Sequence, residues 1–287
     1  MHPVTICIPT YNQVAYLKPL LQGIATQSLQ AQAVIISDDS TTTAVKKLTD
    51  QYNNLPIAYH HNSPSCGTPA NWNNALQLAT TPWVKLMHHD DAFTQTNSLE
   101  IMVTAVTNAK ADYAFCDTII INANKNTSKV HTINNLQRCI NKPWRLYFGN
   151  EIGAPSTLIT NHTIALQLPY CINYKWLVDC VYYYQLFTQN KNGVHVKQAL
   201  ISTTDGATHQ VTTSCISNYP LILQEQQQFA ILINAPKNSL LHKIMQLHLT
   251  ITKLQIRHQQ ADGLRKHLLF TGIIMLRRCV KLYLRLT

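Results

Sequence analysis

Short apolar runs alternate with helical periodicities along the first 93 residues. Runs of β-branched and other apolar residues predict buried strands, and apolar residues spaced three or four apart predict helices. The predicted strands are 4–8, 33–36, 56–60 and 83–89, and the predicted helices are 14–27, 42–53 and 71–79. This alternation predicts an α/β fold in which crossover helices join parallel strands.

The pattern becomes less regular after residue 93, and it predicts a mixed sheet with flanking helices. We expect helices at 99–109 and 239–259, a loop that enters a helix over 174–187, and a loop or hairpin at 122–142. We expect strands at 113–116, 118–121 and 194–201, and a turn into a strand over 152–159. Asp262-Gly263 ends the helix at 239–259, and a segment that is both cationic and apolar follows at 264–287. We therefore divide the chain into an α/β domain, residues 1–230, and a C-terminal helical basic extension, residues 231–287.

Polar residues follow three of the predicted strands where each strand ends. They are Thr10-Tyr11-Asn12, Asp38-Asp39 and an exposed tip at His88–Asp91. Parallel strands joined by crossovers bring these ends to one edge of the sheet, which is where open α/β sheets bind ligands. Paired carboxylates at Asp90 and Asp91 suit a hard divalent cation that also contacts phosphate oxygens. A polar turn that only closes a strand is the alternative, since Asp is common in turns.

Length and composition are those of a folded intracellular protein. The chain has 287 residues, 46% of them hydrophobic, which suffices for a sizeable core. No signal peptide is evident at the start, and the longest apolar stretch, 268–276, is about half of the roughly 20 residues that a membrane span needs. The eight cysteines are scattered without a C-x-x-C pair, which favours a reducing cytosol over a disulfide framework or a zinc ribbon.

The net charge of +10 lies almost entirely in the extension. Residues 1–230 contain 13 Lys and Arg against 12 Asp and Glu, whereas residues 231–287 contain 10 against 1. Such a segment predicts an anionic partner. An interfacial helix on anionic lipid fits 264–287, and a helix packed on the domain or in a homo-oligomer interface fits equally. No nucleic-acid-binding motif is recognised, so a nucleic-acid partner is not expected.

The order and spacing of four motifs resemble those of the family 2 glycosyltransferases of GT-A fold, over roughly residues 1–215. The motifs are Pro9-Thr-Tyr-Asn12, Asp38-Asp-Ser-Thr41, Gly67-Thr-Pro-Ala-Asn71 and Asp90-Asp91. The resemblance implies that Thr10, Tyr11 and Asp39 bind the nucleotide. It implies that Asp91, together with Asp90, binds Mn²⁺ or Mg²⁺. The full predicted nucleotide-sugar site comprises Pro9, Thr10, Tyr11, Asn12, Asp38, Asp39, Gly67, Asn71, His89 and Asp90.

One position departs from the family pattern. Many members have Asp where this chain has His88, so the acidic cluster is smaller. Either His88 or His89 faces the diphosphate or supports the site, or the site binds metal weakly. Direct metal ligation by either histidine is the less favoured alternative, although histidine is a common metal ligand.

The acceptor side of the resemblance lies in residues 152–179. Inverting members carry a catalytic carboxylate at the start of a helix, and Asp179 is the best match, with Glu151 in reserve. The alternative role for Asp179 is to cap that helix. His209 is carried over weakly as a diphosphate contact, because the spacing of its motif differs from the family's.

The resemblance implies an inverting transfer of a sugar from a nucleoside-diphosphate sugar to a hydroxyl of a glycan or lipid-linked glycan. UDP-sugar is the favoured donor, and cell-surface polysaccharide or lipopolysaccharide biosynthesis is the expected role. A cytoplasmic enzyme that is peripheral on the inner face of the membrane fits these features. The alternatives are a nucleotide-sugar-binding scaffold without turnover and a nucleic-acid-binding protein that uses the basic extension.

Overall fold

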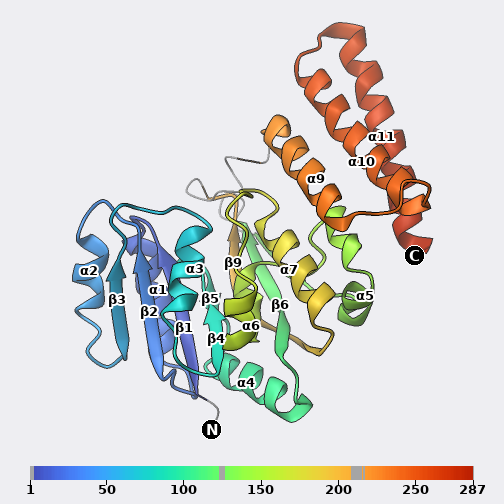
Figure 1. Ribbon diagram of the computed structural model, residues 1–287. Coiled ribbons are helices and arrows are strands. Elements are labelled where there is room, and N and C mark those ends of the chain that lie inside the picture. The colour runs from blue at the N-terminus through green and yellow to red at the C-terminus, as the bar shows by residue number, and fades with distance from the viewer. Residues whose placement is uncertain (1–2, 123–126, 208–214, 216, 287) are drawn as a thin grey trace.

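Helices pack on both faces of a nine-stranded mixed sheet in the computed structural model (Figure 1). The structure describes residues 3–122, 127–207, 215 and 217–286. The order of the strands along the sheet is β3-β2-β1-β4-β8-β6-β9-β5, and β7 pairs with β6. The α/β class with a mixed sheet is therefore confirmed.

The first half of the sheet is parallel, as the alternating pattern predicts. Its strands are β1 (Val4–Thr10), β2 (Ala33–Asp38), β3 (Ile57–His61) and β4 (Trp83–Leu86). The connecting helices are α1 (Val14–Ala25), α2 (Ala44–Thr49) and α3 (Ala70–Gln77). The predicted strand 83–89 ends early, at Leu86, and the polar residues after it form a turn in which Asp91 N donates to His88 O.

The second half of the sheet contains both strand directions. Its strands are β5 (Ala92–Phe93), β6 (Tyr113–Asn122), β7 (Thr127–His131), β8 (Leu158–Asn161) and β9 (Gly193–Asp205). The two strands expected on either side of Asp117 are one continuous strand, β6, so that expectation was wrong. The register against β9 shifts at Asp117, whose Oδ1 accepts hydrogen bonds from Ile133 N at 3.0 Å and from His195 Nε2 at 2.8 Å.

Two hydrophobic clusters fill the space between the sheet and its helices. The helices α1, α2 and α4 (Ser98–Ala109) pack on one face, and α3, α6 (His162–Gln167) and α7 (Val178–Gln189) pack on the other. The second face also receives α5 (Leu136–Asn141) and two 3₁₀ helices, η1 (Pro143–Tyr147) and η2 (Pro155–Thr157). With a layer on each side, the apolar strands are buried and the strand ends are left open for a site.

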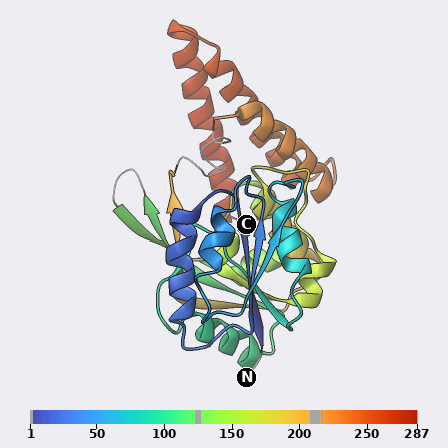
Figure 2. The same ribbon diagram turned by 90° about the vertical axis from the view of Figure 1, so that its left-hand side faces the viewer.

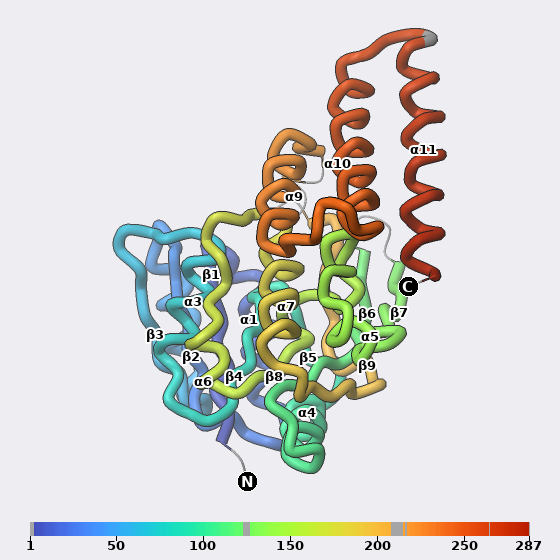
Figure 3. The backbone as a smooth tube through the Cα atoms, turned by 45° about the vertical axis from the view of Figure 1, so that its right-hand side comes forward, coloured from blue at the N-terminus to red at the C-terminus, as the bar shows by residue number. Residues whose placement is uncertain are grey.

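Three further helices form the C-terminal part, namely α9 (Tyr219–Ile233), α10 (Leu240–Gln259) and α11 (Gly263–Leu286). The boundary that we set at residue 230 lies inside α9, near its end, and the division of the chain stays a proposal. Figures 2 and 3 show α10 and α11 as a hairpin that projects away from the sheet. Gly263, with φ of +55°, lies at the turn between them.

The end of α11 returns to the α/β domain. Arg145 Nη1 in η1 donates to Leu284 O at 2.9 Å, and the rings of Trp144 and Tyr283 lie 5.7 Å apart. Among residues 3–122, 127–207, 215 and 217–286, which the structure describes, no helix is both long enough and apolar enough to cross a membrane.

Candidate active site

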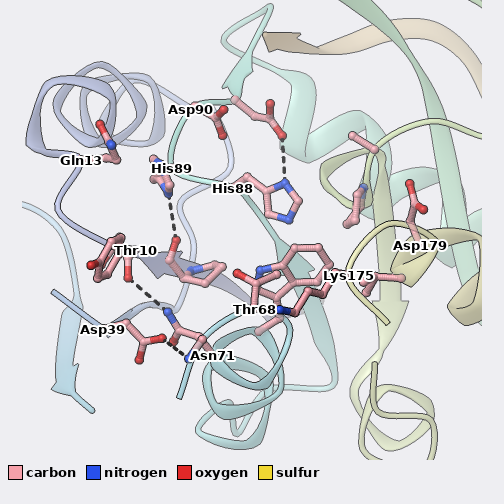
Figure 4. Close-up of a pocket in the computed structure, with 18 of the residues that line it drawn as sticks. Thr10, Gln13, Asp39, Thr68, Asn71, His88, His89, Asp90, Lys175 and Asp179 are labelled. Carbon is pink, nitrogen blue, oxygen red and sulfur yellow. Dashed lines mark hydrogen bonds and ion pairs between the residues drawn. The ribbon is translucent and has the colours of Figure 1, made fainter. Parts of the chain in front are cut away.

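A cavity of about 510 Å³ lies at the edge of the sheet where β1, β2 and β4 end (Figure 4). This volume is in the usual range for small-ligand sites. Ten of the residues predicted from the sequence line it: Pro9, Thr10, Tyr11, Asp39, Gly67, Asn71, His89, Asp90, Asp91 and Asp179. Figure 4 shows Asp39 and Asp179 at opposite sides of the cavity, with His88 between them. The convergence of separate loops on one site is thus present in the structure.

Asn12 and Asp38, which we also expected in the site, do not line the cavity. Asp38 is fully buried, and its carboxylate accepts hydrogen bonds from Thr10 Oγ1 at 2.8 Å and Tyr59 OH at 2.7 Å. Asn12 has a φ of +54°, and its N–H donates to Ser40 Oγ at 2.7 Å. Both residues hold the loops after β1 and β2 in shape, because their polar atoms are used by the protein itself.

Asp39 organises the loop that forms the floor of the cavity. Its Oδ2 accepts from Gly67 N at 2.7 Å, and its Oδ1 accepts from Asn62 Nδ2 at 2.8 Å. Gly67 has a φ of +72°, a region that residues with a Cβ enter only with strain. Asn71 extends this network, since its Nδ2 donates to Thr10 O at 3.2 Å. The ends of β1, β2 and β3 are therefore held together before any ligand binds.

The turn after β4 is less exposed than the sequence suggested. Asp91 is only 5% exposed, and His88, His89 and Asp90 are half-buried. Burial, and secondly the charge of Asp90, raise the pKa of Asp91 well above its usual value. Burial lowers the pKa of His88 to about 4, so its imidazole is neutral at pH 7. The cause of this burial is that the strand ends at Leu86 and the residues after it form a turn closed by the hydrogen bond from Asp91 N to His88 O.

The donor set at this turn fits a divalent cation. Asp91 Oδ2 and His88 Nε2 are buried atoms without a hydrogen-bond partner; Asp91 Oδ2 lies 3.8 Å from His88 Nδ1, and the Asp90 carboxylate is the neighbouring group. Buried polar atoms of this kind need an explanation, and an ion is one. Across the described part of the chain, no three His, Cys, Asp or Glu side chains are grouped to hold a metal by themselves. An ion here would therefore need further ligands from water or from a bound phosphate group, which is how Mg²⁺ commonly binds.

Lys85 supplies a positive charge behind the turn. It lies on β4 with no exposed surface, and its Nζ donates to the carbonyl oxygens of Ser156 and Leu158. Burial lowers the pKa of Lys85 to about 8, while the charge of Asp91 acts in the opposite direction. Ser156 Oγ in turn accepts from His88 N at 3.0 Å. The ends of β4 and η2 are joined in this way beneath the two carboxylates.

Asp179 lies in the first turn of α7, and Leu177 occupies the N-cap position in its place. Asn150 Nδ2 donates to Asp179 Oδ2 at 2.6 Å, and Asp179 Oδ1 accepts from Cys180 N at 2.8 Å. Burial raises the pKa of Asp179 to about 6, against the lowering effect of these hydrogen bonds. A carboxylate with a pKa near neutrality can take up a proton during a reaction at physiological pH.

The N-terminus of α7 is held by a residue that the sequence analysis did not identify. Glu225 on α9 is 1% exposed, and its two carboxylate oxygens accept from Lys175 N at 2.7 Å, Trp176 N at 3.0 Å and Leu177 N at 2.9 Å. These N–H groups would otherwise be unsatisfied at the helix end. Glu225 therefore does the capping that we considered for Asp179.

The two weaker candidates lie elsewhere. Glu151 does not line the cavity, because its carboxylate is paired with Arg145, with Nη2 to Oε1 at 2.7 Å. His209 lies outside the described residues.

The cavity also has walls that we did not predict. Lys175 and Trp176 line it just before Asp179, and Thr203 and Thr204 of β9 line it as well. Trp72 completes one wall, its ring 4.5 Å from that of His88. Lys175 and Trp176 lie within four residues of Asp179, so their place in the sequence was a usable signal. The β9 threonines gave no such signal, since pairing between β6 and β9 cannot be inferred from local pattern.

The model of the family described as glycosyl transferase family 2 matches residues 5–187. The chain therefore belongs to glycosyl transferase family 2. It is 32% identical over 120 residues to the abequosyltransferase RfbV of Salmonella typhimurium, a match that covers 40% of this chain and 35% of that protein. The matched stretch thus spans about a third of this curated relative.

Two solved structures share the fold. TarS of S. aureus in complex with UDP-GlcNAc superposes with a TM-score of 0.66 at 15% identity, over 96% of this chain and 81% of that one. The mannosyltransferase PcManGT of Pyrobaculum calidifontis, in complex with GDP-Man and Mn²⁺, superposes with a TM-score of 0.61 at 15% identity. The superposition covers 98% of this chain and 83% of that one. At this identity the likeness establishes the GT-A-like fold and no more.

Proposed function

We propose that this chain is an inverting glycosyltransferase that transfers a sugar from a nucleoside-diphosphate sugar to a hydroxyl of a glycan or lipid-linked glycan. The observation that carries the proposal is one cavity whose wall contains both the acidic turn after β4 and Asp179, a carboxylate whose pKa is raised to about 6. UDP-sugar is the favoured donor, because a fold neighbour is in complex with UDP-GlcNAc. A role in cell-surface polysaccharide or lipopolysaccharide synthesis is supported by the similarity to an abequosyltransferase.

The nucleotide would bind where β1 and β2 end. Tyr11, which is 52% exposed, offers a flat face for a base. Thr10, Asp39 and the Gly67 loop form the adjoining surface. The Asp39 carboxylate already accepts the Gly67 N–H, so the loop is preorganised and binding the donor costs less conformational entropy.

The diphosphate would lie against the turn after β4, where Asp91 and Asp90 would hold Mn²⁺ or Mg²⁺. The structure of PcManGT, a fold neighbour, in complex with GDP-Man and Mn²⁺ supports that. When bound, such an ion would neutralise negative charge on the leaving nucleoside diphosphate. His88 and His89 would face the diphosphate from the same turn, and Lys175 across the cavity is a further cation.

Asp179 would act as the general base. Its carboxylate would accept the proton of the acceptor hydroxyl as that oxygen attacks the anomeric carbon and the bond to the diphosphate breaks. One displacement inverts the configuration, so no covalent sugar intermediate is needed. Asn150 would keep the carboxylate oriented, and Glu225 would keep the loop of Lys175 and Trp176 in place.

A panel of nucleoside diphosphates and their sugars, measured by thermal shift with and without Mn²⁺, tests the donor site. A ligand at 100 times its Kd should stabilise the fold by about 2.7 kcal/mol. The proposal predicts a Mn²⁺-dependent shift with one nucleotide family that is lost in Asp91→Ala. The matched control is Asp112→Ala, an aspartate that does not line the cavity.

Two other outcomes would favour the alternatives. Donor binding with no turnover against any glycan or lipid acceptor would support a nucleotide-sugar-binding scaffold. The absence of any shift in a folded sample, together with a salt-sensitive gel shift by RNA or DNA, would support a nucleic-acid-binding protein.

A further inference from the structure

The helix α11 has one packed side and one side that no described residue covers. Ile273, Leu276, Val280 and Leu284 belong to the cluster shared with α10, and their spacing of three or four residues defines the packed side. On another side lie four apolar residues that are strongly exposed: Leu268 at 63%, Met275 at 61%, Leu282 at 59% and Leu286 at 79%. Their spacing of seven and four residues places them in one stripe along the helix. We call these four residues the apolar stripe.

Cationic side chains run beside the apolar stripe. Arg278, Lys281 and Arg285 follow one another at helical spacing on its flank, and every Lys and Arg of α11 is exposed. The extension holds 10 Lys and Arg against one acid, Asp262, which lies in the turn before α11. No carboxylate on α11 therefore neutralises this row. An exposed apolar stripe bordered by cations is the pattern of a helix that lies in the surface of an anionic bilayer.

The hairpin of α10 and α11 leaves the apolar stripe and its cationic flank facing outward. The hairpin projects away from the sheet (Figure 3). The packed side of α11 contacts apolar residues of α10. Phe270 is 50% exposed, and its ring lies 6.0 Å from that of His258 on α10, so it borders the contact between the two helices. With 24 residues, α11 is about 36 Å long.

From the charge complementarity and the uncovered stripe, we propose that α11 is an interfacial membrane-binding helix whose occupant is a bilayer containing anionic phospholipid. The apolar stripe enters the boundary between headgroups and acyl chains, and Arg278, Lys281 and Arg285 contact the lipid phosphates. This binding does not depend on the proposed transferase activity. Its link to the cavity does rest on that activity: Arg145 donates to Leu284 O of α11 and pairs with Glu151, which is adjacent to Asn150.

Cosedimentation of the full chain with vesicles tests the proposal without any substrate. The probes are vesicles of phosphatidylcholine alone and of phosphatidylcholine mixed with phosphatidylglycerol. We expect binding at least about tenfold stronger to the mixed vesicles, and weaker binding as salt is added. Arg278→Glu with Lys281→Glu should weaken binding to the mixed vesicles by at least about tenfold, and so should Met275→Ser with Leu282→Ser.

Matched control variants separate this surface from general charge and hydrophobicity. Lys18→Glu with Lys47→Glu changes the net charge equally on α1 and α2, and Leu78→Ser with Leu166→Ser removes exposed leucines elsewhere. Both controls should bind mixed vesicles like the wild type. The residues changed on α11 are exposed, so every variant should keep the wild-type thermal midpoint within a few degrees.

Three outcomes would overturn the proposal. Equal binding to both kinds of vesicle would show that anionic lipid is not required. If the control variants weakened vesicle binding as much as the α11 variants do, α11 would not be the binding surface. A wild-type dimer in light scattering that Met275→Ser with Leu282→Ser dissociates, without vesicle binding, would assign the stripe to a second copy of the chain.

Discussion

Asn150 Nδ2 donates a hydrogen bond of 2.6 Å to Asp179 Oδ2. The same Nδ2 donates to Gly153 O at 2.9 Å, so the amide is fixed by the loop before η2 and not by Asp179 alone. Burial raises the pKa of Asp179, and the bond from Asn150 opposes that rise. The position and the proton affinity of the proposed base are thus controlled by a side chain from a different segment.

Asn150→Ala should move the acidic limb of the pH–rate profile to higher pH. The wild-type kcat/KM should fall as the pH drops through about 6, the pKa of Asp179, because the protonated carboxyl cannot accept a proton. Without the Asn150 hydrogen bond the carboxylate is less stabilised and its pKa rises further. Steady-state rates from pH 5 to 9 measure this; Asn141→Ala, at the end of α5, is the control. An unmoved limb would contradict the assignment of that pKa to Asp179.

Asp179→Asn should stabilise the fold at pH 8 and lose that advantage in acid. The folded-state pKa of Asp179, about 6, exceeds its usual value of 3.8, so the native state favours the protonated carboxyl. The stability that this preference provides is full below the usual pKa and is lost as the pH rises through 6. Asparagine carries no charge, so we expect a gain of roughly 1–3 kcal/mol at pH 8 and almost none near pH 4. Urea unfolding at both pH values measures it; an equal effect at both would show that the cause is not ionisation.

Glu225→Ala should be strongly destabilising and Glu225→Gln less so. The alanine variant removes the acceptor of three N–H groups, those of Lys175, Trp176 and the buried Leu177, at a cost of about 2–4 kcal/mol. Glutamine keeps one oxygen acceptor. At a temperature where both variants fold, KM for the acceptor and Kd for the donor should both rise, because Lys175 and Trp176 line the cavity beside Asp179. Glu100→Ala, an exposed glutamate bonded to Ser28, serves as control and should change stability by less than about 1 kcal/mol.

Gly67→Ala and Gly23→Ala should act in opposite directions. Gly67 has a positive φ, so a Cβ there is strained although no neighbouring atom lies within 4 Å of it. We expect a loss of about 1 kcal/mol and weaker nucleotide binding, since the loop is part of the cavity. Gly23 lies inside α1 with open space around it, so alanine there should gain about 0.5–1 kcal/mol. Urea unfolding and nucleotide titration compare the two, and a stabilised Gly67→Ala would refute the strain.

The local pattern of the chain predicts the parallel half of the sheet well. Buried strands such as 4–8 and 33–36 are short apolar runs that end in polar residues, and both the strands and the convergence of their ends are present in the structure. The order of β8, β6, β9 and β5 depends on pairings between distant segments, which no local period encodes. The same limit explains Asp117, where a buried aspartate is retained in a strand by His195 across the sheet.

Individual polar residues were harder to assign than their neighbourhood. Asp38 and Asp39 are adjacent in sequence and chemically identical. Yet the Asp38 carboxylate accepts hydrogen bonds from Thr10 and Tyr59, while Asp39 lines the cavity. Lys85 lies within an apolar run and would be expected at the surface, but carbonyl oxygens of η2 and β8 accept hydrogen bonds from its Nζ. Glu225 is some 50 positions from the backbone that it caps. Such partnerships follow from tertiary structure alone.

The most direct test of the account compares Asp179→Asn with the wild type in donor binding and in turnover. Kd is measured with the nucleotide sugar selected by the thermal-shift panel. Turnover is the release of nucleoside diphosphate in the presence of a glycolipid extract from cells that naturally make the protein. We predict that Kd stays within about twofold, while the rate falls by roughly 10²–10⁴-fold. A folded Asp179→Asn enzyme that turns over at the wild-type rate would contradict the assignment of Asp179 as the base.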